Sequence, residues 1–299
     1  MKLFIMLFIA LFFGGCVQDM DKMLTPAALD NYMSLTGVSH EKRESISKLS
    51  NTLVKSMEDI TPEQEYYIGR TVSATILSRY KPYSNSKAQS YVNQIGYQLS
   101  FHSELPHTYG GYHFQILDSD EINAFAAPGG FIFLTRGILQ CAGSEDAVAA
   151  IIAHELAHIT NRHGLQTIKS SRWSEMGSVL TIEASKHYSN KNIAKLVTTF
   201  EGSISDIVNT MIVNGYSREY EMQADKTALA ILEKSGYNPS SMSEMLHLME
   251  QKIKPGQTGF ASTHPSPSDR LKAIEEANPL KIEIPIIRNN RFQTNLAKI

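Results

Sequence analysis

Residues 151–160 read IIAHELAHIT, and this stretch places His154, Glu155 and His158 in the order His-Glu-x-x-His. Successive residues of a helix are rotated by about 100°, so the two histidines project from one face about a turn apart. Both imidazoles can therefore reach a single Zn²⁺ at roughly 2.0 to 2.1 Å. Glu155 stands beside them, where a carboxylate can take the proton of a metal-bound water.

The apolar residues around these histidines predict a helix that is buried on one side. They recur every three or four positions, at Val148, Ile152, Leu156 and Ile159. A stripe with this spacing faces the core, and the histidines flank it, so we expect them to border a cleft. Ser144 is a favourable N-cap and Gly164 a favourable stop, which predicts a helix between these two residues.

A catalytic zinc ion needs a third protein ligand and one open position. An extended histidine motif would place that ligand at position 164, but the chain has Gly164 there. The other option is a glutamate on a later helix, followed one turn further on by an aspartate that orients a ligating histidine. Among the glutamates from Glu175 to Glu244, only Glu221 has an aspartate, Asp225, four residues later.

The composition is that of an ordinary globular chain. Of the 299 residues, 42% are hydrophobic and 19% are charged, which excludes wholesale disorder, a collagen-like repeat and a polytopic membrane protein. The 28 lysines and arginines nearly balance the 30 aspartates and glutamates, and the formal net charge is -2. We therefore expect no nucleic-acid partner, since a polyanion binds clustered positive charge.

The first sixteen residues have the pattern of a bacterial lipoprotein leader. One lysine precedes eleven apolar residues, and a Gly-Gly-Cys sequence ending at Cys16 follows. Eleven residues are too few to span a bilayer, and a cysteine after two small residues resembles a lipobox. We expect residues 1–15 to be a signal peptide and Cys16 to be lipidated; an ordinary secretory cleavage site and an uncleaved anchor are the alternatives. Cys141 would then be the one remaining thiol, so no intramolecular disulfide is expected.

The rest of the chain predicts a mostly helical α+β fold with a small β-sheet beside the His-Glu-x-x-His helix. Residues 16–40 suit a tether, and residues 41–299 are expected to form a single domain. Helices are expected at 41–59, 62–79, 88–99, 217–234 and 240–252, and strands at 112–117 and 131–134.

Five motifs in this order resemble one known family. They are Thr61-Pro62-Glu63-Gln64-Glu65, Asn123-Ala124-Phe125-Ala126 with Pro128-Gly129-Gly130, His154 to His158 with Arg162-His163-Gly164, Ser217-Arg218 to Asp225, and Thr263-His264-Pro265 with Arg270. Together they resemble the HtpX-like and CAAX prenyl protease family of zinc metallopeptidases, the gluzincins, in its soluble periplasmic BepA-like branch. The resemblance covers about residues 61–278.

This resemblance implies a zincin-type metallopeptidase domain that holds one Zn²⁺ per subunit through His154, His158 and Glu221. It implies Glu155 as the general base and Asp225 as the residue that orients a ligand. The expected function is a zinc-dependent endopeptidase of the bacterial cell envelope that hydrolyses misfolded or stalled envelope proteins. Val17, after the lipidated cysteine, implies sorting to the inner leaflet of the outer membrane, facing the periplasm.

Substrate binding is expected at the strand that follows Pro128-Gly129-Gly130. An extended substrate can pair with an unpaired edge strand through main-chain hydrogen bonds, and in the family the Asn123-Ala124 segment borders the cleft in this manner. Asn123, Ala124, Gly130 and Phe131 are therefore candidate substrate-binding residues. The alternative is an ordinary sheet strand with a glycine turn.

The Pro-flanked His264 is a candidate regulatory fourth ligand. In relatives of the periplasmic branch, the histidine of the corresponding loop covers the cleft and occupies the open coordination position of zinc. The alternative is a histidine that only caps its own loop. His163 follows His158 by five residues, about 140° round a continuous helix, and is interpreted as structural. Arg218 and Arg270 are interpreted as ion-pairing or loop-anchoring residues.

A function of another class stays open. The chain can instead be an assembly factor or chaperone for outer-membrane proteins, whose metal site is regulatory and whose main task is client binding. An edge strand and a covered cleft serve that role equally well.

Overall fold

The computed structural model describes residues 60–168, 202, 204–252, 264, 267–277, 282–296 and 299. The predictions for the leader, for Cys16, for the tether and for a helix at 41–59 lie outside these residues. Within the described ranges, no helix combines the length and the hydropathy that crossing a bilayer requires.

Two helices open the described chain. Helix α5 (Pro62–Arg79) begins with the predicted capping box, in which the Thr61 side chain accepts from the Gln64 amide and the Gln64 side chain accepts from the Thr61 amide. Helix α6 (Ser86–Phe101) follows, and the Asn85 side chain caps it by accepting from the Ala88 amide. The apolar stripes of both helices are buried.

The sheet has three strands in the order β1-β3-β2. Strand β1 (His113–Leu117) is parallel to β3 (Phe131–Thr135), whereas β2 (Ala124–Ala127) is antiparallel to it. The two predicted strands are confirmed, and β2 is an addition. Its sequence, AFAA, carries neither the β-branched residues nor the polar alternation that signal a strand.

The expectation that the strand after Gly130 forms an unpaired edge is wrong. Phe131 pairs with His113 of β1 on one side and with Ala127 of β2 on the other. Gly129 and Gly130 have φ values of 76° and 107°, which only glycine adopts readily. This turn folds β2 back onto β3, so β3 becomes the central strand and β1 and β2 form the edges.

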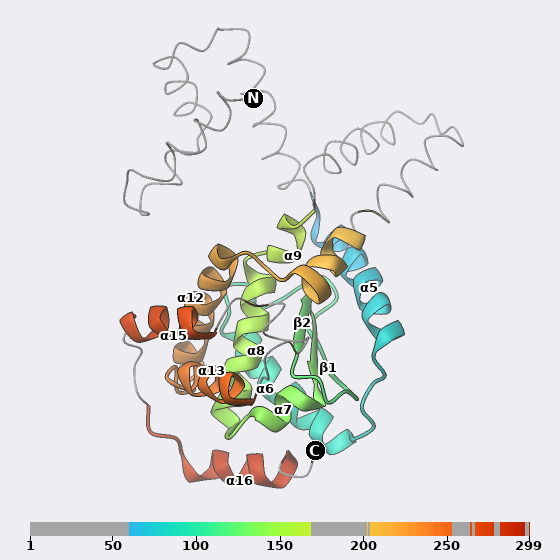
Figure 1. The fold of residues 1–299 in the computed structure, drawn as a ribbon. Helices are drawn as coiled ribbons and strands as arrows, with labels where there is room; N and C mark the ends of the chain where they lie inside the picture. Colours follow the sequence, from blue (N-terminus) through green and yellow to red (C-terminus); the bar gives the residue numbers. More distant parts are fainter. Residues whose placement is uncertain are drawn as a thin grey trace, which may run out of the picture. The chain divides into compact units, whose positions relative to one another are not determined.

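The sheet lies between two groups of helices (Figure 1). Ala124 and Ala126 of β2 pack with helix α8 (Glu145–Thr160), which follows the short helix α7 (Arg136–Cys141). Phe125 and Ala127, which alternate with them, pack with α5 on the opposite face. Strand β2 therefore runs beside the helix that carries the His-Glu-x-x-His motif, as predicted.

Helix α8 ends at Thr160, before the predicted stop at Gly164. Arg162 has a φ of 55°, the left-handed conformation, which breaks the helix before the four-residue helix α9 (His163–Gln166) starts. His163 therefore does not continue the surface of α8.

The C-terminal helices pack around α8. Helix α12 (Arg218–Lys234) begins after the N-cap Ser217, as predicted, and lies along α8. The π-helix η2 (Thr210–Asn214) contacts β2. Helices α13 (Ser241–Lys252) and α15 (Pro267–Glu276) pack on each other, and α16 (Ile286–Asn295) lies against α8 (Figure 1).

Candidate metal centre

Four side chains that are far apart in the sequence meet between α8 and α12. His154 and His158 come from α8 and Glu221 comes from α12, while His264 belongs to the segment before α15. One ligand atom from each of the four lies within 4.8 Å of the others, and all four residues are buried. The structure thus brings together the three predicted ligands and the candidate fourth.

The distances between these atoms match those around a small cation. Four ligands at about 2.0 to 2.1 Å from one ion in a tetrahedron lie about 3.3 to 3.4 Å apart. The Nε2 atoms of His154 and His158 are 3.1 Å apart, and each lies 3.3 Å from an oxygen of Glu221. Two imidazoles and one carboxylate are also a ligand set that zinc prefers.

Unsatisfied polar atoms give a second test of this fit. Within the described chain, Oε2 of Glu221 and Oε1 of Glu155 are buried and make no hydrogen bond. A buried carboxylate oxygen without a hydrogen bond is costly, and a cation held by the cluster would satisfy Oε2 of Glu221. The residues present therefore fit a bound zinc ion.

The two ligating histidines have opposite electrostatic surroundings. Burial and the nearby Arg270 both disfavour protonation of His154, but the carboxylates of Asp225 and Glu221 beside the ring outweigh them and raise its pKa to about 9. Burial dominates at His158 and lowers its pKa to about 3, although Glu221 opposes this effect. His158 is thus neutral, as a ligand must be, whereas His154 would have to lose its proton before it could bind a metal ion.

The predicted orienting residue lies where the spacing places it. Oδ1 of Asp225 is 3.0 Å from Nδ1 of His154, on the ring edge that faces away from the cluster. Arg270 donates to both oxygens of Asp225, at 2.6 and 2.8 Å. Burial opposes ionisation of Asp225, but the charge and hydrogen bonds of Arg270 outweigh it and hold the pKa of this carboxyl well below its usual value.

Arg270 and Arg218 both form ion pairs, as expected, but Arg270 is buried and Arg218 is exposed. Arg270 is 2% exposed, and its Nη1 lies 3.4 Å from Oε2 of Glu221, so it belongs to the buried surroundings of the site. Arg218 pairs with Asp269 at 2.8 Å on the surface, where both side chains are at least half exposed.

Glu155 lies beside the cluster and does not join it. It is 1% exposed, and its Oε1 is 4.0 Å from Nε2 of His264. Burial raises the pKa of Glu155 above its ordinary value, although the nearby imidazoles of His264 and His154 oppose the shift. A raised pKa brings a carboxylate closer to the range in which a general base works at neutral pH.

His264 makes close contacts with two of the predicted ligands. Its Nδ1 lies 2.8 Å from Oε1 of Glu221 and 3.4 Å from Nε2 of His154. Because the ring is 3% exposed, it covers the metal cluster from the side of α15. His264 is therefore buried among the predicted ligands, and its role as a regulatory fourth ligand stays a prediction.

Two aromatic contacts of the site do not follow from any spacing in the sequence. The ring of Tyr216 stacks on His158 with 4.2 Å between centroids and 19° between planes. His163 lies 3.0 Å from Nδ1 of His158 and stacks on Tyr220 at 4.6 Å. The left-handed conformation of Arg162 interrupts the helix, so His163 contacts His158, which its position on a continuous helix would not allow.

The candidate substrate-binding residues are not all near the cluster. Asn123 and Ala124 lie at the start of edge strand β2, and the Asn123 side chain accepts from the Ala124 amide and donates to Glu121. Phe131 instead stacks on His113 and on Tyr66.

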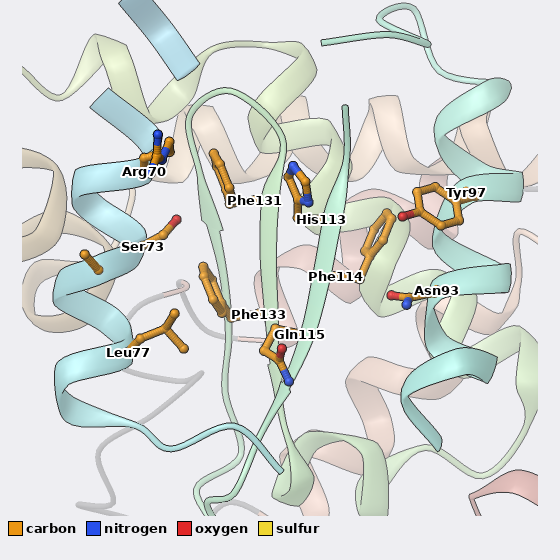
Figure 2. Close-up of a pocket in the computed structure, with 11 residues that line it drawn as sticks. Arg70, Ser73, Leu77, Asn93, Tyr97, His113, Phe114, Gln115, Phe131 and Phe133 are labelled. Carbon is orange, nitrogen blue, oxygen red and sulfur yellow. The ribbon is translucent and has the colours of Figure 1, made fainter. Parts of the chain in front are cut away.

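A cavity of about 410 Å³ lies between α5 and α6 over the face of the sheet. Figure 2 shows Phe131 and Phe133 of β3 on its floor, with Arg70 and Leu77 of α5 at its side. None of the residues that line it belongs to the metal cluster. The Phe131 side chain therefore points toward this cavity, and the structure does not bring it to the site.

Known proteins are similar to this chain in sequence. The "Beta-barrel assembly-enhancing protease" of Escherichia coli (strain K12) is 28% identical over 218 residues, which are 70% of this chain and 42% of that protein. The "Mitochondrial metalloendopeptidase OMA1" of Schizosaccharomyces pombe is 31% identical over 162 residues, 52% of this chain and 44% of that protein. The chain thus spans less than half the length of these curated relatives. The model of peptidase family M48 matches residues 86–278, and the chain therefore belongs to this family.

Proposed function

We propose that this chain is a zinc-dependent endopeptidase of the bacterial cell envelope that cleaves misfolded or stalled envelope polypeptides. The observation that carries the proposal is the meeting of His154, His158 and Glu221 around one point, with the buried Glu155 beside them. Membership of peptidase family M48 supports it. The name of the bacterial relative, which concerns assembly of β-barrels, supports an envelope substrate.

Each side chain of the site would have its own role in peptide hydrolysis. A bound zinc ion would polarise the scissile carbonyl and make a bound water more acidic. His154, His158 and Glu221 would hold it, with His154 oriented by Asp225. Glu155 would accept the proton of the attacking water and pass it to the leaving amine.

We also assign a substrate-binding strand and a membrane anchor. The substrate would pair with edge strand β2, where Asn123 and Ala124 lie. Lipid on Cys16, after removal of residues 1–15, would hold the domain of residues 41–299 at the inner leaflet of the outer membrane through the tether 16–40. The Gly-Gly-Cys sequence supports this anchoring.

His264 would act as a regulatory fourth ligand. Its Nδ1 lies 2.8 Å from Glu221, so the imidazole would take the position that an active site keeps open for water and substrate. An imidazole bound there would block water and substrate, and its departure would open the site.

The alternative of an assembly factor with a regulatory metal site is less well supported. Glu155 is a buried carboxylate beside the cluster, which hydrolysis would use and a site that only binds metal would not need. Chelation separates the two functions: an assembly factor keeps its client binding and has no casein degradation to lose, whereas a peptidase loses casein degradation.

Substitution of the proposed base tests the function directly. Glu155→Gln preserves the shape of the side chain but cannot accept a proton, so we expect one bound zinc per chain and a fall in casein cleavage of about 10²- to 10⁴-fold. Glu233→Gln, at an exposed position of α12, is the matched control and should cleave normally. Zinc-dependent cleavage at the wild-type rate by Glu155→Gln would refute the proposal.

A further inference from the structure

We infer that His163 is a positioning residue for the metal centre and fixes the ring of His158 through a hydrogen-bond relay that ends on Gln223. This inference rests on the proposed function, because it assigns His163 a task at the proposed zinc site. It goes beyond the ligands themselves and gives a role to a histidine whose place in the sequence suggests only packing.

The relay runs away from the cluster in two steps. Nε2 of His158 faces the other ligands, at 3.1 Å from Nε2 of His154, which leaves Nδ1 on the opposite edge of the ring. This Nδ1 lies 3.0 Å from Nδ1 of His163, and Nε2 of His163 lies 3.2 Å from Oε1 of Gln223.

Only one arrangement of protons satisfies all three members. A neutral imidazole that binds metal through Nε2 carries its proton on Nδ1, so His158 donates to Nδ1 of His163. His163 must then carry its own proton on Nε2 and donate it to Gln223. The amide oxygen of Gln223 accepts hydrogen bonds, so its position beside Nε2 of His163 agrees with the tautomers that metal binding requires.

The surroundings hold this relay in place. His163 is fully buried and stacks on Tyr220 at 12° between ring planes, while Tyr216 covers His158. Gln223 stands two residues after Glu221 on α12. One helix therefore supplies both a ligand to the metal and the acceptor that orients a second ligand.

The two histidine ligands thus have partners of different charge. His154 faces the carboxylate of Asp225, whose charge Arg270 balances, whereas His158 faces the neutral pair of His163 and Gln223. Since partners of this kind orient a ligand and raise its basicity, their loss weakens metal binding even when no ligand is removed.

The test is the affinity of metal-free full-length protein for Zn²⁺, measured by competition with a chromogenic chelator. His163→Phe keeps an aromatic ring on Tyr220 but cannot accept from His158, and we expect binding about 10- to 100-fold weaker. Gln223→Leu should weaken binding as well, whereas Gln223→Glu, which still accepts, should bind at least as tightly as wild type. Met222→Leu, at a half-exposed neighbour on α12, should bind as wild type.

If His163 served only for packing, the zinc affinities of these variants would follow a different pattern. Gln223 is exposed, so both of its variants should fold even if His163→Phe does not, and they decide the question alone. Equal affinities of the Leu and Glu variants, or wild-type affinity in folded His163→Phe, would overturn the relay while leaving the proposed function intact. A wild-type chain that binds no zinc would instead defeat the proposed function and the relay with it.

Discussion

The carboxylate of Asp225 lies 3.0 Å from Nδ1 of His154, so the aspartate one turn after Glu221 contacts a ligand from the neighbouring helix. Helix α12 thereby supplies Glu221 to the cluster and Asp225 to the back of His154. Arg270 holds the same carboxylate with two hydrogen bonds. The geometry explains why these two acids occur four residues apart.

Asp225→Asn tests this arrangement. The amide keeps the size of the side chain but loses the charge that stabilises the His154 proton and pairs with Arg270. We expect zinc affinity to fall about 10- to 100-fold in a chelator competition. Asp269→Asn, which breaks only the exposed pair with Arg218, should bind zinc normally. If both variants bound zinc equally well, Asp225 would have no orienting role.

Zinc affinity should rise with pH. The pKa of His154 is raised to about 9 in the metal-free protein, whereas that of His158 is lowered to about 3, so near pH 7 His154 has a proton to lose and His158 has none. Zinc must displace this proton, and the apparent dissociation constant should fall about tenfold per pH unit between about pH 7 and 8.5. Calorimetry in buffers of different ionisation enthalpy should detect about one proton released per zinc. An affinity independent of pH would show that His154 is already neutral.

Removal of the covering histidine should activate the enzyme. His264→Ala opens the fourth position of the cluster, and if the ring occupies it most of the time, casein cleavage should increase about threefold or more. The exposed His247 on α13 offers a matched substitution, His247→Ala, which should change nothing. Unchanged or lower cleavage by His264→Ala would count against a regulatory ligand.

Helix α16 should stabilise the start of α8. Arg288 donates at 2.8 Å to Asp146, which is fully buried. Loss of a partner from a buried charge is costly, so Arg288→Ala should lower the free energy of unfolding by about 2 to 4 kcal/mol in urea titrations of metal-free protein. Arg218→Ala, at the exposed pair with Asp269, should cost about 0 to 1 kcal/mol. Equal losses of unfolding free energy in the two variants would mean that the burial of Asp146 does not strengthen its pair with Arg288.

The site was largely predictable because its chemistry follows helical spacing. His154, Glu155 and His158 occupy consecutive turns of one helix, and Glu221 with Asp225 repeats the i, i+4 relation on another. Such relations are local and can be read without knowing how the helices pack. The pairing of these helices and the approach of His264 came from the family resemblance.

The features that the sequence did not predict depend on local backbone conformations, which the spacing of apolar and polar residues does not indicate. Strand β2 has an alanine-rich sequence, and its return onto β3 depends on the glycine turn at Gly129 and Gly130, so the central place of β3 could not be foreseen. Arg162 adopts a left-handed conformation although it is not glycine. This single residue ends α8 early and turns His163 toward His158, which a helical wheel places elsewhere.

The central claim is that Glu221 completes a zinc site that cleaves peptides, and paired substitutions on α12 test it most directly. Zinc per chain and casein cleavage should be measured for Glu221→Ala and for Glu219→Ala, whose side chain is exposed two positions earlier. We predict that Glu219→Ala binds one zinc and cleaves casein, whereas Glu221→Ala loses tight zinc binding and cleavage together. A Glu221→Ala protein that kept one zinc per chain and cleaved casein at the wild-type rate would contradict the account.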